Sequence, residues 1–332
     1  ALDVTYDSQG KMMCVSETAR DEGCVPFDIF GANTISPEVI EYLSVPQSLD
    51  SNVQQTVIGT HLSGDTGWEL AAGPIAFSAG LEYREEKGSE EPGAAEQLGI
   101  VTVSQLFPTD GEYDVAEVYG EVRLPIHDLL TIESAARYGD YSTVGGNTSW
   151  KIGLESLPTY AVRFRATISE SVRAPNVAEL YAGASEVFFG VADACDGIDN
   201  SSTGNTAENC RSIPAIQQRI DEQGAFVLSV LEKGTTAGFQ SGNPEVSEET
   251  AESWTLGVVW TPEQWENLSV AMDWYDIEIE DAIRLVDRAT VVNRCYGVEP
   301  SLFDPDCGGR TIRYDGNGVL IEVNNSVSNE DD

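Results

Sequence analysis

The chain has 332 residues and a formal net charge of −38, because 18 lysines and arginines stand against 56 aspartates and glutamates. This excess of negative charge repels polyanions, so we expect no nucleic-acid partner, and it disfavours an anionic membrane surface. Hydrophobic residues make up 41% of the sequence, which excludes a disordered acidic tail. No apolar run has the length of a spanning helix, so any membrane protein of this sequence must cross the bilayer with strands.

The six cysteines form three local pairs in the sequence. Their spacings are not CxxC, and the two histidines lie far from them in sequence, so a zinc site has little support. We therefore predict three disulfides and an oxidising compartment such as a periplasm or the cell exterior; six reduced thiols are the alternative. The predicted pairs are Cys14 with Cys24, Cys195 with Cys210, and Cys295 with Cys307.

Several segments alternate between apolar and polar residues with a period of two, which predicts β-strands. The first is Ile75 to Arg84, where Phe77 and Leu81 share one face and Glu82 lies on the other. Charged residues keep to one face almost throughout, and the strands number about ten when they are placed in order. The same alternation recurs at 117–124, 130–138, 150–154, 160–168, 254–260 and 268–274.

The connections between these strands differ strongly in length. Some are short turns that contain proline, whereas the long loops cover about 7–52, 85–112, 171–250 and 282–310. Compact soluble domains rarely carry such loops, but outer-membrane barrels have short periplasmic turns on one rim and long loops on the other. We therefore expect an all-β fold, an antiparallel transmembrane β-barrel segment with long extracellular loops, over residues 1–332.

Two of the long loops carry helix signals. Ser36 offers an N-cap, with Pro37 at the first helical position, which predicts a short helix there. A second helix is predicted from near Pro214 towards Leu231, with Gly224 as a weak point.

Two motifs resemble those of a known family. Residues 169–181 read SESVRAPNVAELY, which is similar to the strand-end motif of TonB-dependent outer-membrane receptors. Residues 242–257 read GNPEVSEETAESWTLG, which looks like a second motif of that family, and the two occur in the family's order. Val172 replaces an expected phenylalanine, and Ser247 and Glu248 replace an expected turn-forming pair.

The resemblance implies active uptake of a scarce solute, such as a siderophore or a carbohydrate, across the outer membrane of a Gram-negative bacterium. Members of the family have barrels of about 22 strands closed by a plug, and the TonB complex acts on that plug. The sequence opens without a signal peptide, and we find no plug and no final strand in it. We therefore expect the middle of a barrel, with outer-membrane lipid as its surroundings.

Two sets of loop residues are candidate sites. Acidic side chains crowd the loop around Cys195, and oxygen ligands at short spacing suit calcium; an acidic hydrated loop is the alternative. Aromatic loop residues beside an arginine suit stacking on a solute, although each also suits packing within the loop. The candidate calcium ligands are Asp193, Asp196, Asp199 and Glu208, and the candidate solute contacts are Arg173, Tyr181, Phe188, Phe189 and Tyr296.

Enzymatic activity is not expected. The sequence holds no GxSxG, GxGxxG or HExxH motif, and its many carboxylate pairs suit a solvated lumen balanced by arginines. No cofactor is required, apart from the calcium considered above. The alternatives are a passive porin-like barrel and a secreted acidic β-protein that binds calcium or glycan.

Overall fold

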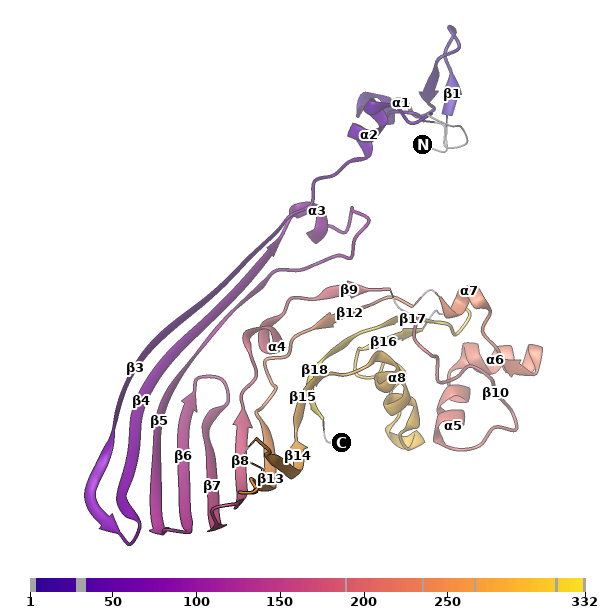
Figure 1. Ribbon diagram of the computed structural model, residues 1–332. Coiled ribbons are helices and arrows are strands. Elements are labelled where there is room, and N and C mark those ends of the chain that lie inside the picture. Colours follow the sequence, from indigo (N-terminus) through magenta and orange to yellow (C-terminus); the bar gives the residue numbers. More distant parts are fainter. Residues whose placement is uncertain are drawn as a thin grey trace.

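The computed structural model describes residues 4–27, 34–188, 190–234, 236–265, 267–313 and 316–330. Its main feature is one antiparallel sheet of eight strands in the order β14-β13-β8-β7-β6-β5-β4-β3, in which neighbours along the chain are neighbours in the sheet (Figure 1). The strands are β3 (Leu49–Leu70), β4 (Gly73–Pro92), β5 (Thr109–His127), β6 (Leu130–Tyr141), β7 (Gly145–Thr159), β8 (Val162–Arg173), β13 (Glu249–Trp260) and β14 (Val270–Glu280).

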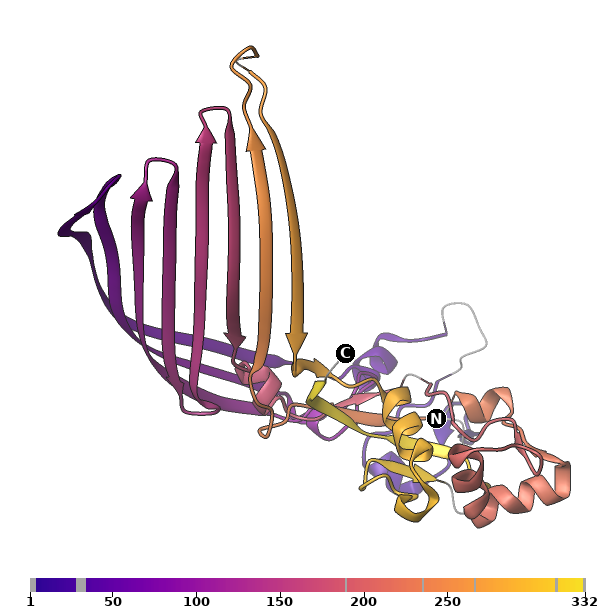
Figure 2. The same cartoon turned by 90° about the horizontal axis from the view of Figure 1, so that it is seen from below.

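The sheet curves like part of a barrel wall (Figure 2). The turns that join β3 to β4, β5 to β6, β7 to β8 and β13 to β14 lie at one rim, whereas the short turn between β6 and β7 lies at the other. Register places the apolar side chains on a common outward face: Trp254 lies opposite Ile168, and Leu256 opposite Trp274. These side chains are exposed, with Trp254 52% and Leu256 55% accessible, so the apolar face is not covered by another layer of this chain. None of the helices in the described part of the chain has the length and apolar character that a membrane span requires.

The strands at one edge are longer than the sequence pattern predicted. β3, β4 and β5 have 22, 20 and 19 residues, whereas β8 and β13 have 12 each. The predicted loop 85–112 therefore shrinks to 93–108, because β4 continues to Pro92 and β5 begins at Thr109. The extension is polar on both faces, with Lys87 bound to Glu112 across the strands at 2.7 Å, so the apolar alternation fades although the ladder continues.

At the other rim, the long loops form small sheets and helices. A four-stranded sheet has the order β15 (Ala282–Leu285), β18 (Asn325–Glu330), β12 (Gly238–Ser241) and β9 (Ser185–Val187), and β12 runs parallel to β18. The two-stranded sheets are β1 (Val4–Tyr6) with β2 (Met12–Cys14), β10 (Ile198–Asp199) with β11 (Ala225–Phe226), and β16 (Thr311–Arg313) with β17 (Leu320–Val323). The helices are α1 (Glu17–Asp21), α2 (Pro37–Leu43), α3 (Ala94–Gln97), α4 (Val177–Tyr181), α5 (Asn205–Ser212), α6 (Pro214–Gln223), α7 (Val230–Lys233) and α8 (Arg288–Gly297), with a 3-10 turn at Pro300–Leu302.

Both predicted loop helices form, with one difference. The Ser36 hydroxyl accepts a hydrogen bond from the Val39 N–H at the start of α2, as its capping role predicts. The second helix is shorter than predicted, because α6 ends where Gly224 adopts the left-handed conformation with φ of 87°. That residue closes α6 as a C-cap. Beyond it, Leu231 belongs to α7, whereas Val227 and Leu228 lie between β11 and α7.

The main buried core lies outside the large sheet, in a unit that we call the loop module: residues 190–234, 286–313 and 316–323. Apolar side chains from two separate loops meet there, including Ile216 and Phe226 from the first and Val292 and Tyr296 from the second. The structure contains the three disulfides that the local cysteine pairs predicted. Two of them, Cys195–Cys210 and Cys295–Cys307, belong to this module.

Candidate functional site

Arg173 marks the point where the barrel wall meets the loops. It is the last residue of β8, and Pro175 follows it without an N–H to continue the ladder. Asn176 then caps α4, and Glu179 completes a capping box by accepting from the Asn176 N–H. Arg173 Nη1 donates to Glu179 Oε2 at 2.9 Å, so Arg173 neutralises a carboxylate of the helix that follows it.

A second carboxylate extends this junction to two more elements. Arg173 Nε donates to Glu249 Oε1 at 2.6 Å, and the other oxygen of Glu249 accepts from the Ile283 N–H at 2.9 Å. The side chains of Arg173 and Glu249 thus join β8, α4, β13 and β15. The sequence analysis missed the part played by Glu249; its position opposite Arg173 in the register is the signal that would have found it. Contact of Arg173 with a solute stays a prediction.

Tyr181, at the end of α4, lies against the wall. Its ring sits so close to Gly111 on β5 that a Cβ at Gly111 would overlap it. Phe188 is 60% exposed just beyond β9, whereas Phe189 lies outside the described residues. Tyr181 therefore packs on the wall, whereas Phe188 is open to solvent, and solute contacts of these aromatic residues stay predictions.

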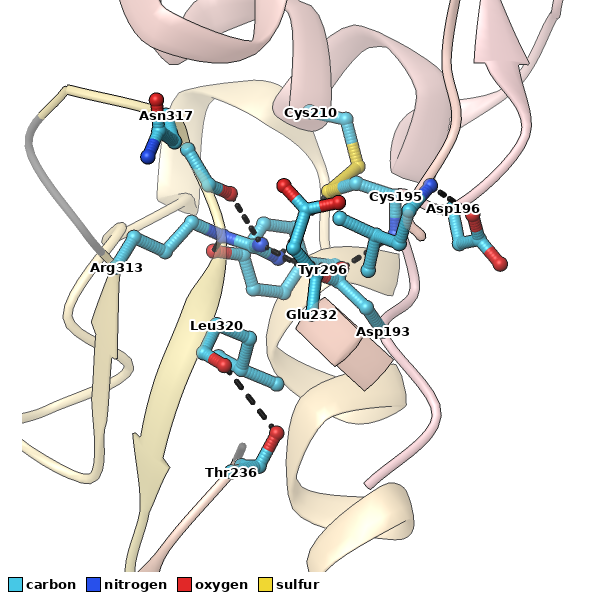
Figure 3. A network of polar contacts seen from close by, with 12 residues as sticks. Asp193, Cys195, Asp196, Cys210, Glu232, Thr236, Tyr296, Arg313, Asn317 and Leu320 are labelled. Carbon is cyan, nitrogen blue, oxygen red and sulfur yellow. Dashed lines mark hydrogen bonds and ion pairs between the residues drawn. A yellow bond between two sulfur atoms is a disulfide. The ribbon is translucent and has the colours of Figure 1, made fainter. Parts of the chain in front are cut away.

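Tyr296 differs from its predicted role, because it is fully buried in the loop module (Figure 3). Arg313 lies over the Tyr296 ring at 4.6 Å, and its Nε donates to the Tyr296 hydroxyl at 2.5 Å. Burial raises the pKa of Tyr296, although Arg313 opposes that shift. Tyr296 therefore serves the core of the module, and its assignment as a solute contact is corrected.

Arg313 also forms the most buried ion pair among the described residues. Its Nη1 donates to Asp193 Oδ2 at 2.6 Å and its Nη2 donates to Asp193 Oδ1 at 2.8 Å, a bidentate arrangement. The two side chains are only 7% and 1% exposed, and they come from the two different loops. A second link is made by Asn209, whose Nδ2 donates to the carbonyls of Tyr296 and Val298. The two loops are thus interlocked by polar contacts within an apolar core.

The candidate calcium ligands are engaged separately. Asp193 pairs with Arg313, and Asp196 binds both the Lys233 ammonium and the Leu228 N–H. Hydrogen bonds from Ser202 and Ser201 lower the pKa of Asp199 within its own turn. Within the ranges that the structure describes, no three histidine, cysteine or acidic side chains come close enough to hold a metal ion. The four residues, Glu208 included, do not form one site; calcium binding elsewhere stays a prediction.

The inward face of the sheet carries the charges that the alternation placed there. Arg137 binds Glu117 at 3.0 Å, and Arg165 Nη2 binds Asp273 at 2.6 Å across strands. These pairs balance the acidic side chains of the wall, as expected for a polar lumen.

The antiparallel sheet is curved, with an exposed apolar outer face and a charged inner face. Most of its short turns lie at one rim, and the folded loops lie at the other. Together these features define a segment of a transmembrane β-barrel. A family model described as "TonB dependent receptor-like, beta-barrel" matches residues 25–318. The chain belongs to this family of outer-membrane receptors, which confirms the resemblance and the fold class.

Solved structures with the same fold are distant in sequence. The siderophore receptor PirA from Acinetobacter baumannii is 13% identical, with a TM-score of 0.50 over 85% of this chain and 33% of its own. A variant of the ferric enterobactin receptor PfeA from Pseudomonas aeruginosa, in complex with enterobactin, is 13% identical, with a TM-score of 0.52 over 84% of this chain and 32% of its own. A double mutant of the hemophore receptor HasR from Serratia marcescens, in complex with its hemophore HasA and heme, is 13% identical. Its TM-score is 0.50 over 85% of this chain and 38% of its own.

The chain spans about a third of the length of these receptors. No curated protein matches it. The family consists of receptors and transporters rather than enzymes.

Proposed function

We propose that this chain is part of the barrel of an outer-membrane receptor that takes up a scarce solute with energy supplied through the TonB complex. The observation that carries the proposal is the position of the loop module, which is folded, disulfide-linked and lies beyond the loop rim of a membrane-type sheet (Figure 2). At that rim, Arg173 and Glu249 join the wall to α4 and β15. The solute is a siderophore, a carbohydrate or a similar scarce compound, and the similarity to siderophore, ferric enterobactin and hemophore receptors supports the first of these.

The orientation is part of the proposal. The long loops face the cell exterior, the short turns face the periplasm, and lipid surrounds the face that carries Trp254 and Trp274. Three disulfides agree with this placement, because such bonds persist in oxidising compartments.

Uptake tests the function directly. The full-length protein that contains this chain is produced in cells that lack it, and accumulation of candidate ferric siderophores and oligosaccharides is measured with and without a working TonB complex. TonB-dependent accumulation of one solute supports the proposal, and accumulation that is indifferent to TonB favours a passive barrel.

Protease added to intact cells tests the orientation. Cleavage within the loop module, with the turn at 160–161 intact, is expected. Cleavage of the module only after the outer membrane is opened would contradict the proposed orientation.

A further inference from the structure

A pocket of about 540 Å³ lies at the edge of the loop module, between α8, the turn that follows it and the neighbouring strand β18. Its apolar wall is formed by Val286, Val291, Val298 and Leu302, and the Cys295–Cys307 disulfide joins α8 to the turn that closes one side. This volume lies within the range of small-molecule sites, which combine apolar walls with a few polar groups.

The charged groups of this pocket are mostly engaged with one another. Arg294 and Glu330 form a bidentate ion pair, and Glu330 also accepts from the Ser328 hydroxyl at 2.8 Å. Asp304 accepts from the Asp306 N–H at 3.1 Å and from the Gly308 N–H at 3.0 Å, so its two oxygens serve the turn. These contacts hold the pocket wall in place.

Arg310 is the exception. Its backbone is fixed, because its N–H donates to the Asp306 carbonyl and its own carbonyl accepts from the Asn324 N–H. Its guanidinium makes no hydrogen bond or ion pair with any residue that the structure describes. The chain has only 18 basic residues for 56 acidic ones, so an exposed guanidinium that lines a pocket without an acidic partner among the described residues is unusual here.

We propose that this pocket binds an apolar small molecule that carries a carboxylate, with the carboxylate paired to Arg310. The planar guanidinium presents parallel donors that match a carboxylate bidentately, and the valine and leucine side chains cover the apolar part of the ligand. The net negative charge of the chain does not prevent this binding, because salt screens exposed charges over about 8 Å at physiological ionic strength. The inference rests on the proposed receptor function and names the class of solute that its loops capture.

Binding of a simple probe to the purified full chain in detergent tests the proposal. The probe is 3-phenylpropionate, its neutral analogue is 3-phenylpropanol, and saturation-transfer NMR measures the affinity of each. Saturable binding of the carboxylate is expected, weakened about tenfold or more in Arg310→Gln, because a charge-assisted bidentate contact is lost. The weaker binding of the alcohol is expected to be the same in both proteins.

Two further variants separate the site from general effects. Arg123→Gln removes the same charge from the sheet wall and is expected to leave binding unchanged. Leu302→Asp places an acid in the pocket at a side chain that is 73% exposed, so the fold tolerates it, and binding of the carboxylate is expected to disappear.

Absence of saturable binding, or equal affinity in Arg310→Gln and the unaltered chain, would overturn the proposal. Because this experiment involves no transport, its failure leaves TonB-dependent uptake standing. Conversely, a measured affinity for the probe would still support the pocket if cells showed no uptake.

Discussion

Arg173 and Glu249 lie directly opposite each other at the ends of β8 and β13, and Arg173 Nε donates to Glu249 Oε1 at 2.6 Å. Glu249 in turn receives the Ile283 N–H, so the first strand beyond the barrel wall depends on this pair. The barrel and its loops therefore meet through a small number of directional contacts.

Replacing Arg173 with lysine tests that dependence. Lysine keeps the charge but lacks the fork that binds Glu249 and Glu179 together. Because the Arg173 side chain is 43% exposed, we expect a local loss of only about 1 kcal/mol. Faster hydrogen exchange at the Ile283 N–H is the expected result. Arg165→Lys, which alters a similar pair with Asp273 on the wall, is the control, and unchanged exchange at Ile283 in Arg173→Lys would contradict the dependence.

The buried pair of Asp193 and Arg313 predicts a larger effect. Arg313→Met leaves the Asp193 carboxylate buried without its partner, and we expect the loop module to lose about 3–5 kcal/mol. The double variant Asp193→Leu with Arg313→Met removes both charges and is expected to recover much of this loss. Chymotrypsin sensitivity of the module measures both, and a double variant as sensitive as the single one would show that the charges are not the cause.

The disulfides should differ in their resistance to reduction. Cys195 and Cys210 are fully buried, whereas Cys295 and Cys307 are half-buried beside the pocket. Access of a thiolate to sulfur governs thiol exchange, so mild reductant should open Cys295–Cys307 first. Mass spectrometry after alkylation gives the order, and early labelling of Cys195 would show that the module opens as a whole.

Stability of the C-terminal strand is expected to depend on acid pH. Hydrogen bonds from Arg294 and Ser328 outweigh the effect of burial and lower the pKa of Glu330 to about 2. A carboxylate with a lowered pKa contributes stability above its unfolded pKa, near 4.3, and loses it as the pH falls towards 2. At pH 6, the β18 amides should therefore exchange their hydrogens faster in Glu330→Gln than in the unaltered chain. The difference should vanish near pH 2, and a constant difference across that range would contradict the shift.

An acidic row on the outer face offers a stabilising substitution. Glu252 lies directly opposite Glu170 on one neighbouring strand and Glu278 on the other. Like charges in opposed positions destabilise a sheet, so Glu252→Gln is expected to gain about 0.2–1 kcal/mol at low salt. Urea unfolding in detergent measures the gain, which should shrink when salt is added. Glu121→Gln on the inward face, opposite the neutral Ser78 and Ala135, is the control.

Much of the wall could be predicted because it follows a local rule. The seven alternating segments correspond to β4 to β8, β13 and β14, whereas β3 was not among them. On the outward face of β3, Ile58 and Leu62 are separated by Thr60, and Gly64 follows, so the alternation is diluted. With β3 added to the seven segments, the large sheet has eight strands among the described residues, whereas the expected number was about ten.

The candidate site was less accessible to the same reasoning. Arg173 and Glu179 are only six residues apart, so their ion pair joins neighbours in the sequence. Asp193 was assigned to calcium because its neighbours in sequence are acidic, yet its partner Arg313 is 120 residues away. Tyr296 was taken for a surface aromatic because nothing near it in sequence reports that α5 covers it.

The two loops that share the core of the module are far apart in the sequence, and this distance affects how the chain matures. The first loop cannot complete its core until the residues around α8 and β16 have been made, because those residues supply Val292, Tyr296 and Arg313. The disulfides within these loops, by contrast, close over only 15 and 12 residues, so each can form as soon as its own loop is exported. Oxidation can therefore precede docking, so that each loop is already covalently restrained when the two halves of the core meet.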